Sequence, residues 1–155
     1  MAWRNEAKFG NCRVDKLFLG TANGGKGTQV FANGTMGATI TVGTEAANVI
    51  NVGIQLTDAS GDATAAANAL DFYLSSDSAG QTLETSGPDA IAIGTDGVLI
   101  KNGSDSLISG KVISEADGDI DLDLTHAGAD AFYLNLILPN GKIATSGVIT
   151  FDATT

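Results

Sequence analysis

The chain of 155 residues has little cysteine, histidine or proline, with one, one and two residues of each, and only 17% of its residues are charged. A single cysteine cannot form an internal disulfide, so nothing points to an oxidising compartment. No apolar run approaches the roughly 18–20 residues of a membrane span, and the first residues lack the pattern of a secretory signal peptide. We therefore expect no membrane partner.

Basic residues are also scarce. Eight Lys and Arg against 18 Asp and Glu give a formal net charge of −10. Phosphates repel a strongly acidic protein, so nucleic acid is not an expected partner. His126 is the sole histidine, the residue type most used for proton transfer, and the sequence shows no metal-ligand cluster. We expect a protein that is not an enzyme and that uses no cofactor and no metal.

Charge and glycine divide the chain in two. Residues 1–44 carry five bases and two acids, a net charge of +3, whereas residues 45–155 carry three bases and sixteen acids, a net charge of −13. Eight of the 20 glycines lie in residues 1–44, and glycine packs no side chain. This segment is nevertheless too apolar for a solvated linker. We interpret it as a glycine-rich, extended N-terminal arm that is buried on a partner; the alternative is that it packs on the rest of the chain as extra strands or a flap.

Alternation of apolar and polar residues dominates the sequence after residue 48. It is most regular in residues 119–124, and it recurs in residues 49–56, 70–75 and 132–138. A period of two places each apolar set on one side of a strand. One dry face and one wet face predict antiparallel sheets packed face to face.

Turn sequences separate these runs, at residues 58–62, 94–97 and 139–142, and a last strand is expected in residues 147–151. About seven short strands predict an all-β fold, an immunoglobulin-like antiparallel β-sandwich over residues 45–155. The cysteine pair and core tryptophan of antibody domains are absent, so apolar packing alone would hold this domain. Tyr133 resembles the tyrosine corner of such folds, in which a tyrosine hydroxyl bonds back to the backbone.

Two stretches resemble binding motifs. Residues 20–26 match the first part of a phosphate-binding loop, but Gly27 stands where a hydroxyl would bind magnesium, and strand and turn sequence follows instead of a helix. The acidic run 115–123 suggests calcium, yet its alternating apolar residues indicate a strand, along whose wet face carboxylates lie about 7 Å apart. We expect a turn and a solvated strand face; a loop calcium bound by Asp117 and Asp119 is the alternative.

Three runs of the C-terminal part resemble domains of tailed-bacteriophage virion proteins: residues 113–122, 132–142 and 147–151. They are similar in particular to head decoration (cement) proteins and related structural proteins with an immunoglobulin-like module. The resemblance covers residues 46–152 and does not extend to the arm. It implies a virion component that is not an enzyme and, for the decoration proteins, one that binds the outer capsid at symmetry axes or between capsomers.

We therefore expect a capsid decoration protein that is made in the cytoplasm of a bacterial host and carried on the outer surface of the virion. The arm would dock on the major capsid protein or on sister subunits of a homotrimer, and the sandwich would project outward. The predicted docking residues are basic and aromatic: Trp3, Arg4, Lys8, Phe9, Arg13, Lys16, Phe18 and Lys26. The alternative is a tail or fibre module that binds a host receptor or glycan, which the aromatic content of 6% makes less attractive. A tail-tube or connector subunit is a third, weaker hypothesis.

Overall fold

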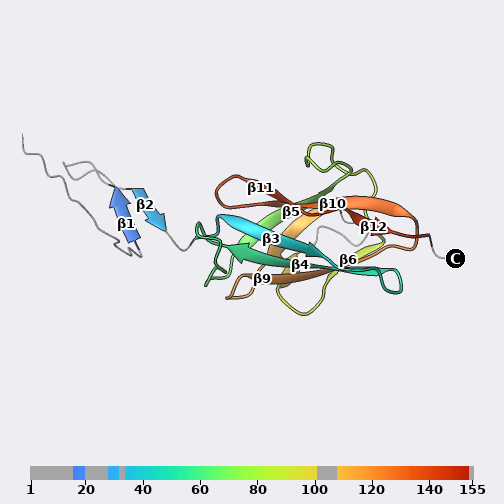
Figure 1. Ribbon diagram of the computed structural model, residues 1–155, viewed down its shortest axis with the longest axis horizontal. Coiled ribbons are helices and arrows are strands. Elements are labelled where there is room, and N and C mark those ends of the chain that lie inside the picture. The colour runs from blue at the N-terminus through green and yellow to red at the C-terminus, as the bar shows by residue number, and fades with distance from the viewer. Residues whose placement is uncertain (1–15, 20–27, 32–33, 101–107, 154–155) are drawn as a thin grey trace, which may run out of the picture. The chain divides into compact units, whose positions relative to one another are not determined.

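The computed structural model describes residues 16–19, 28–31, 34–100 and 108–153. These residues form strands and turns, and no helix occurs among them. The chain divides into two compact units, Met1–Ala32 and Asn33–Thr155, and each is described here by itself (Figure 1).

The first unit contains one strand pair. β1 (Lys16–Leu19) and β2 (Thr28–Phe31) pair antiparallel, with Lys16 opposite Phe31. An isolated two-stranded hairpin is at best marginally stable in water. The described residues of this unit therefore supply no substantial core of their own.

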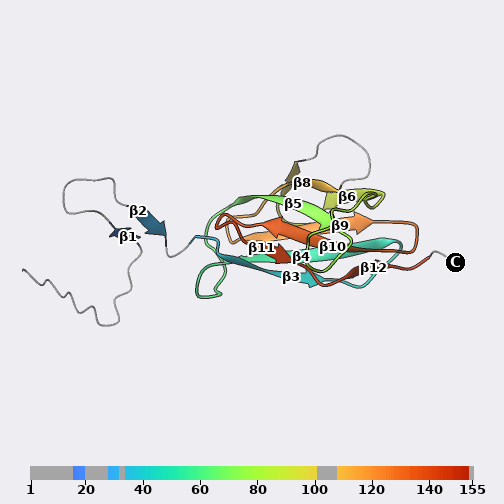
Figure 2. The same cartoon turned by 90° about the horizontal axis from the view of Figure 1, so that it is seen from above.

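The second unit is a sandwich of two antiparallel sheets. The first sheet has the strand order β3-β4-β9-β6, and the second sheet has the order β11-β10-β5-β8-β7, with β12 also paired to β10. Figures 1 and 2 show strands of both sheets running along the length of this unit. The strands are β3 (Gly37–Val42), β4 (Val49–Thr57), β5 (Ala69–Ser75), β6 (Ala90–Ile93), β7 (Val98–Ile100), β8 (Ser109–Ile113), β9 (Asp119–Thr125), β10 (Asp130–Ile137), β11 (Ile143–Thr145) and β12 (Ile149–Phe151).

The strand order is compatible with an immunoglobulin-like arrangement. β3, β4, β9 and β6 follow the order A-B-E-D, and β10 lies between β5 and the β11–β12 edge as strand F lies between C and G. β8 and β7 extend the second sheet beyond β5, although they precede β9 in the chain. The predicted all-β antiparallel sandwich is confirmed.

The core lies between the two sheets and contains 18 buried apolar side chains. In β9, Ile120, Leu122 and Leu124 are fully buried, while the aspartates between them remain partly exposed. Each fully buried side chain of this size contributes roughly 1.5–3 kcal/mol of hydrophobic burial. The second unit therefore has a core that is independent of the first unit.

The sandwich begins earlier in the chain than the sequence indicates. β3 lies in residues 1–44, which were predicted to form the arm, but it pairs with β4 along its whole length, from Gly37 opposite Thr57 to Val42 opposite Val52. Its residues 38, 40 and 42 are apolar and pack against the core. The boundary between the units consequently lies at Ala32. The sequence did not indicate β3, because its period-two pattern lies in a glycine-rich stretch.

The tyrosine that bonds to the backbone is Tyr73 of β5, and its bond runs forward along the chain. Its hydroxyl donates a 2.7 Å hydrogen bond to the carbonyl oxygen of Gly80. Tyr133 of β10, for which that bond was predicted, makes no side-chain hydrogen bond among the described residues. The prediction named the wrong strand, because both tyrosines point to the outer side of the second sheet and only Tyr73 lies beneath the loop that follows β5.

Candidate functional site

Two of the eight predicted docking residues lie within the described residues. Lys16 and Phe18 stand two positions apart on β1, where Phe18 is opposite Gln29 of β2. The other six lie outside the described residues, as does the glycine-rich loop of residues 20–26: Trp3, Arg4, Lys8, Phe9, Arg13 and Lys26. Docking through this segment stays a prediction.

The outer face of the first sheet is acidic. β9 presents Asp119, Asp121 and Asp123 on this face, and each is partly exposed between buried neighbours. The side-chain amide of Asn51, on the adjacent β4, donates a 2.9 Å hydrogen bond to Asp123 Oδ1. The predicted solvated row of carboxylates is confirmed.

A threonine hydroxyl connects the middle aspartate of this row to Asp96, which follows β6. Thr95 Oγ1 lies 2.5 Å from Asp121 Oδ2 and 2.9 Å from Asp96 Oδ2. A hydroxyl carries one proton, so it donates to one carboxylate at a time. The two carboxylates are therefore close neighbours that share a single donor.

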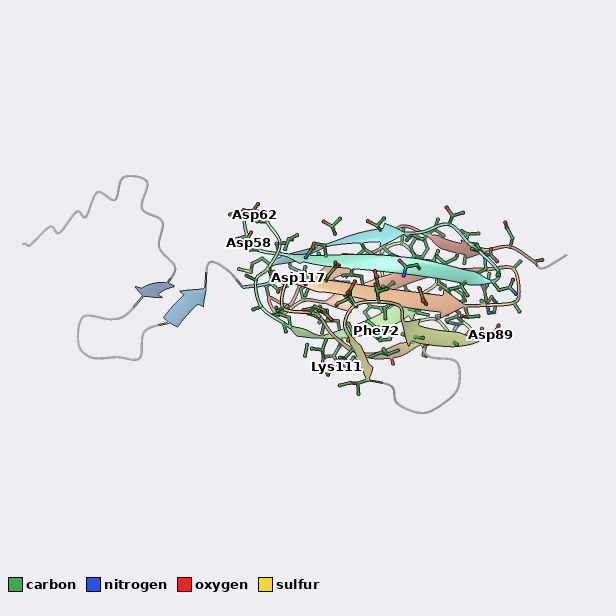
Figure 3. All side chains as sticks on the ribbon, turned by 90° about the horizontal axis from the view of Figure 1, so that it is seen from below. Asp58, Asp62, Phe72, Asp89, Lys111 and Asp117 are labelled. Carbon is green, nitrogen blue, oxygen red and sulfur yellow. The ribbon has the colours of Figure 1, made fainter. Side chains whose placement is uncertain are left out.

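Burial and the neighbouring acids both act on the carboxyl of Asp119. Partial burial raises the pKa of the Asp119 carboxyl above its ordinary value, and the negative charges of Asp96, Asp117 and Asp121 raise it further. The ionised form is therefore disfavoured in the folded protein. Figure 3 shows Asp58 and Asp62 toward the same end of the sandwich as Asp117, and Asp89 toward the other end, so acidic residues lie near both ends.

The calcium alternative finds no ligand set in this region. Within the described ranges, no group of three or more His, Cys, Asp or Glu side chains is placed to hold a metal ion. Asp117 Oδ1 instead lies 3.4 Å from the backbone N–H of Asp119, and Gln55 Nε2 donates to the Asp117 carbonyl at 2.9 Å. These contacts shape the turn between β8 and β9.

The outer face of the second sheet has a different character. One row of side chains crosses β11, β10, β5, β8 and β7, and each member stands directly opposite the next: Ile143, Ile137, Asp71, Lys111 and Ile100. Opposed residues on antiparallel strands project to the same side of a sheet. Lys111 Nζ and Asp71 Oδ1 form an ion pair at 2.6 Å, with both side chains largely in solvent. We call this set the crossing row.

A hollow of about 430 Å³ lies along the crossing row. Ile100 and Ile137 flank it, and Asp71, Lys111 and Tyr73 also line it. The sequence alone does not indicate this face. The crossing row joins strands that are far apart in the chain, and neither β8 nor β11 was predicted, so no local pattern could reveal it.

A second hollow, of about 620 Å³, lies between the β3–β4 loop and β12. Val148 lines it and is 47% exposed, and Glu45 Oε2 accepts the backbone N–H of Asp152 at 2.8 Å across it. This bond ties the end of β12 to the loop. The hollow holds two acids and no histidine, cysteine or base among its lining residues.

His126 follows β9 and serves packing. Its ring meets Phe132 and Phe151 edge to face, with ring centroids 5.7 Å apart in both pairs. Its Nδ1 is buried without a hydrogen bond, 3.6 Å from Asp89 Oδ2. Two core phenylalanines therefore hold the imidazole in place.

No helix long and apolar enough to cross a membrane is found among the residues that the structure describes. Comparison of the chain with protein-family models, with curated proteins and with solved structures gives no match.

Proposed function

We propose that this chain is a capsid decoration protein of a tailed bacteriophage, with the major capsid protein as its partner. The observation that carries the proposal is the contrast between the two units. Met1–Ala32 holds five bases and two acids, whereas Asn33–Thr155 holds three bases and sixteen acids around a core of 18 buried side chains. The first unit is suited to docking, and the second is suited to remaining in solvent.

The acidic sandwich has the surface of an outward-facing module. Carboxylates line the first sheet along β9, and others lie at both ends of the sandwich (Figure 3). Like charges on neighbouring copies repel, which keeps such modules soluble at the high local density of a capsid surface. The raised pKa of Asp119, caused by burial and by the acids around it, shows the same repulsion within one copy.

The basic and aromatic residues of the first unit would make the capsid contact. Aromatic and arginine side chains are enriched at protein interfaces, and Trp3, Arg4, Phe9 and Arg13 are of these types. A site formed only by assembled capsomers would bind this unit and stabilise the shell by mass action. Capsid binding would weaken as salt screens the basic residues.

The test is co-sedimentation with capsids of the encoding phage assembled without this chain. We expect the full chain to bind saturably and residues 33–155 to bind at least tenfold more weakly. That fragment keeps the complete core, so its folding can be checked by circular dichroism. The variant Arg4→Glu/Arg13→Glu should lose binding, while Lys101→Glu/Lys142→Glu, with the same change in net charge, should retain it.

Two results would overturn the proposal. If the full chain does not bind the capsids, decoration is wrong; if residues 33–155 bind as tightly as the full chain, the docking role of the first unit is wrong. Binding of residues 33–155 to host-surface glycans, without capsid binding, would instead favour the tail or fibre module.

A further inference from the structure

Exposed apolar side chains concentrate on the outer face of the second sheet. Among the described residues, seven large hydrophobic side chains are exposed, and four of them belong to this face. Their exposed fractions run from 42% to 54%: Val98, Ile100, Ile137 and Ile143. Clustered apolar exposure of this kind marks an interaction surface.

The crossing row is complementary to itself. Consider a two-fold axis that lies in the plane of contact, parallel to the strands and midway between β5 and β8. This axis places β5 of one copy over β8 of the other, and β10 of one copy over β7 of the other. Asp71 of one copy therefore stands over Lys111 of the other, and Ile137 stands over Ile100. The dimer thus has two contacts between Asp71 and Lys111, which carry opposite charges, and two contacts between the apolar side chains of Ile137 and Ile100.

Other ways of facing two copies lack this match. A two-fold axis perpendicular to the strands would place Asp71 over Asp71 and Lys111 over Lys111, which is repulsive. The hollow along the row leaves room for the partner's lysine side chain, because it is lined by Asp71 and Tyr73 and opens between the flanking isoleucines. Charge complementarity therefore indicates that a second copy of this chain binds to this face, and that the two-fold axis is parallel to the strands.

We propose that the outer face of the second sheet is a self-association surface, through which two copies of this chain form a two-fold symmetric dimer. In this dimer the ion pairs of two copies join into a group of four alternating charges, and the isoleucines close its two sides. This dimer is independent of capsid binding, because the first unit has no part in it. It differs from the homotrimer and the monomer, between which the sequence leaves the oligomeric state open.

The size of the face sets the expected strength. Five strands about 4.8 Å apart, each contributing about five residues at 3.4 Å, cover a flat area of at most about 400 Å², and the loop after β5 covers part of it at Tyr73 and Asn135. Standard interfaces bury about 800 Å² on each partner. We therefore expect a dimer that dissociates on dilution, and sedimentation velocity over a concentration series of the full chain should show a monomer–dimer equilibrium.

Charge reversal provides a sharp test. Asp71→Lys places two lysines against two lysines in the dimer, and Lys111→Asp places two aspartates against two aspartates. Each variant alone should dimerise at least tenfold more weakly than the native chain. An equimolar mixture of the two should form heterodimers, because every contact is again between opposite charges. The double variant Asp71→Lys/Lys111→Asp should recover the homodimer.

Apolar substitutions supply a second, independent measurement. Ile137→Ser should weaken the dimer, whereas Met36→Ser, which changes a side chain of similar exposure next to β3 of the first sheet, should not. A native chain that stays monomeric at about 1 mM would overturn the proposal, because even a dimer with a Kd of about 1 mM would be well populated at that concentration. So would a dimer that is unaffected by both single charge reversals and by Ile137→Ser, since another surface, such as the first unit, would then form it.

Discussion

The Tyr73 hydroxyl donates its hydrogen bond to the carbonyl of Gly80, seven residues further along the chain. This bond holds the loop after β5 against the outer side of the second sheet. The buried Asn135 side chain lies under the same loop, where its amide donates to Ser75 Oγ at 2.8 Å and its oxygen accepts from Thr145 Oγ1 at 2.8 Å. A small polar network therefore joins β5, β10 and β11 next to the proposed dimer face.

Tyr73→Phe should destabilise the sandwich by about 0.5–1.5 kcal/mol, the net contribution of one intramolecular hydrogen bond. The phenyl ring fits the same space, so the change removes the hydroxyl alone. Chemical denaturation should show a lower midpoint at an unchanged m-value. Tyr133→Phe is the matched control, because Tyr133 is also half-buried on this sheet and makes no side-chain hydrogen bond among the described residues. Equal losses in the two variants would contradict this account of the loop.

Gly118 and Gly61 form a second matched pair. Both have φ of +87°, but a Cβ at Gly118 would collide with Thr64 Oγ1, whereas a Cβ at Gly61 would meet no atom within 4 Å. Thr64 is buried and β-branched, so it has little freedom to move away. Gly61→Ala should cost about 1–2 kcal/mol for the left-handed backbone. Gly118→Ala should cost about 1–3 kcal/mol more, because the site is overpacked.

Differential scanning calorimetry of the two alanine variants measures this difference. A Gly118→Ala variant as stable as Gly61→Ala would mean that the turn between β8 and β9 shifts without cost. It would also mean that the Thr64 side chain, whose Oγ1 has no hydrogen-bond partner among the described residues, can move away from the added methyl group.

Much of the sandwich could be predicted from the sequence, because its longest strands have one dry and one wet face. The predicted runs 49–56, 70–75, 119–124 and 132–138 correspond to β4, β5, β9 and β10 within one or two residues. Period two is a local signal, so it survives without knowledge of the partners of a strand. These four strands also supply most of the core.

The strands that the sequence did not predict are short or depend on distant partners. β8 has the sequence Ser-Gly-Lys-Val-Ile, with a single fully buried apolar residue, and it is a strand because it pairs with β5 on one side and β7 on the other. β11 has three residues. The crossing row needs both strands, so the surface it forms could not be predicted from local patterns.

Asp119→Asn should stabilise the folded protein at pH 7. Partial burial and the nearby charges of Asp96, Asp117 and Asp121 raise the pKa of Asp119 above its ordinary value of 3.8. The native state therefore holds this proton more firmly than the unfolded chain does. Stability falls as the pH rises from 3.8 through the native pKa, and the amide variant escapes that loss.

The measurement is thermal unfolding of both proteins between pH 3 and pH 7. The advantage of Asp119→Asn should grow across this range and disappear near pH 3, where Asp119 is protonated in both states. Added salt should reduce the advantage at pH 7, because about 1 M salt shortens the Debye length to about 3 Å. An advantage that is the same at every pH would show that repulsion among these acids is not its cause.

Asp77→Asn should have the opposite effect at pH 7. The backbone N–H of Thr82 bonds Asp77 Oδ2 at 2.5 Å, while the N–H groups of Ala79 and Gln81 bond Oδ1. The bond from Thr82 is the largest cause that lowers the pKa of Asp77 below 3.8, and burial opposes it. The charged carboxylate therefore contributes stability that is present above pH 3.8 and lost as the pH falls through the native pKa.

The loop N–H groups bond to both carboxylate oxygens of Asp77, whereas asparagine has one side-chain oxygen. In Asp77→Asn at least one backbone N–H must therefore face the side-chain NH₂ group. Asp58→Asn is the matched control, because Asp58 receives both of its loop N–H groups, from Ser60 and Asp62, on Oδ1 alone. Thermal unfolding at pH 7 should show a clear loss for Asp77→Asn and a small one for Asp58→Asn, and the difference should narrow toward pH 2. Equal losses at pH 7 would mean that the second oxygen of Asp77 adds nothing to the stability of this loop.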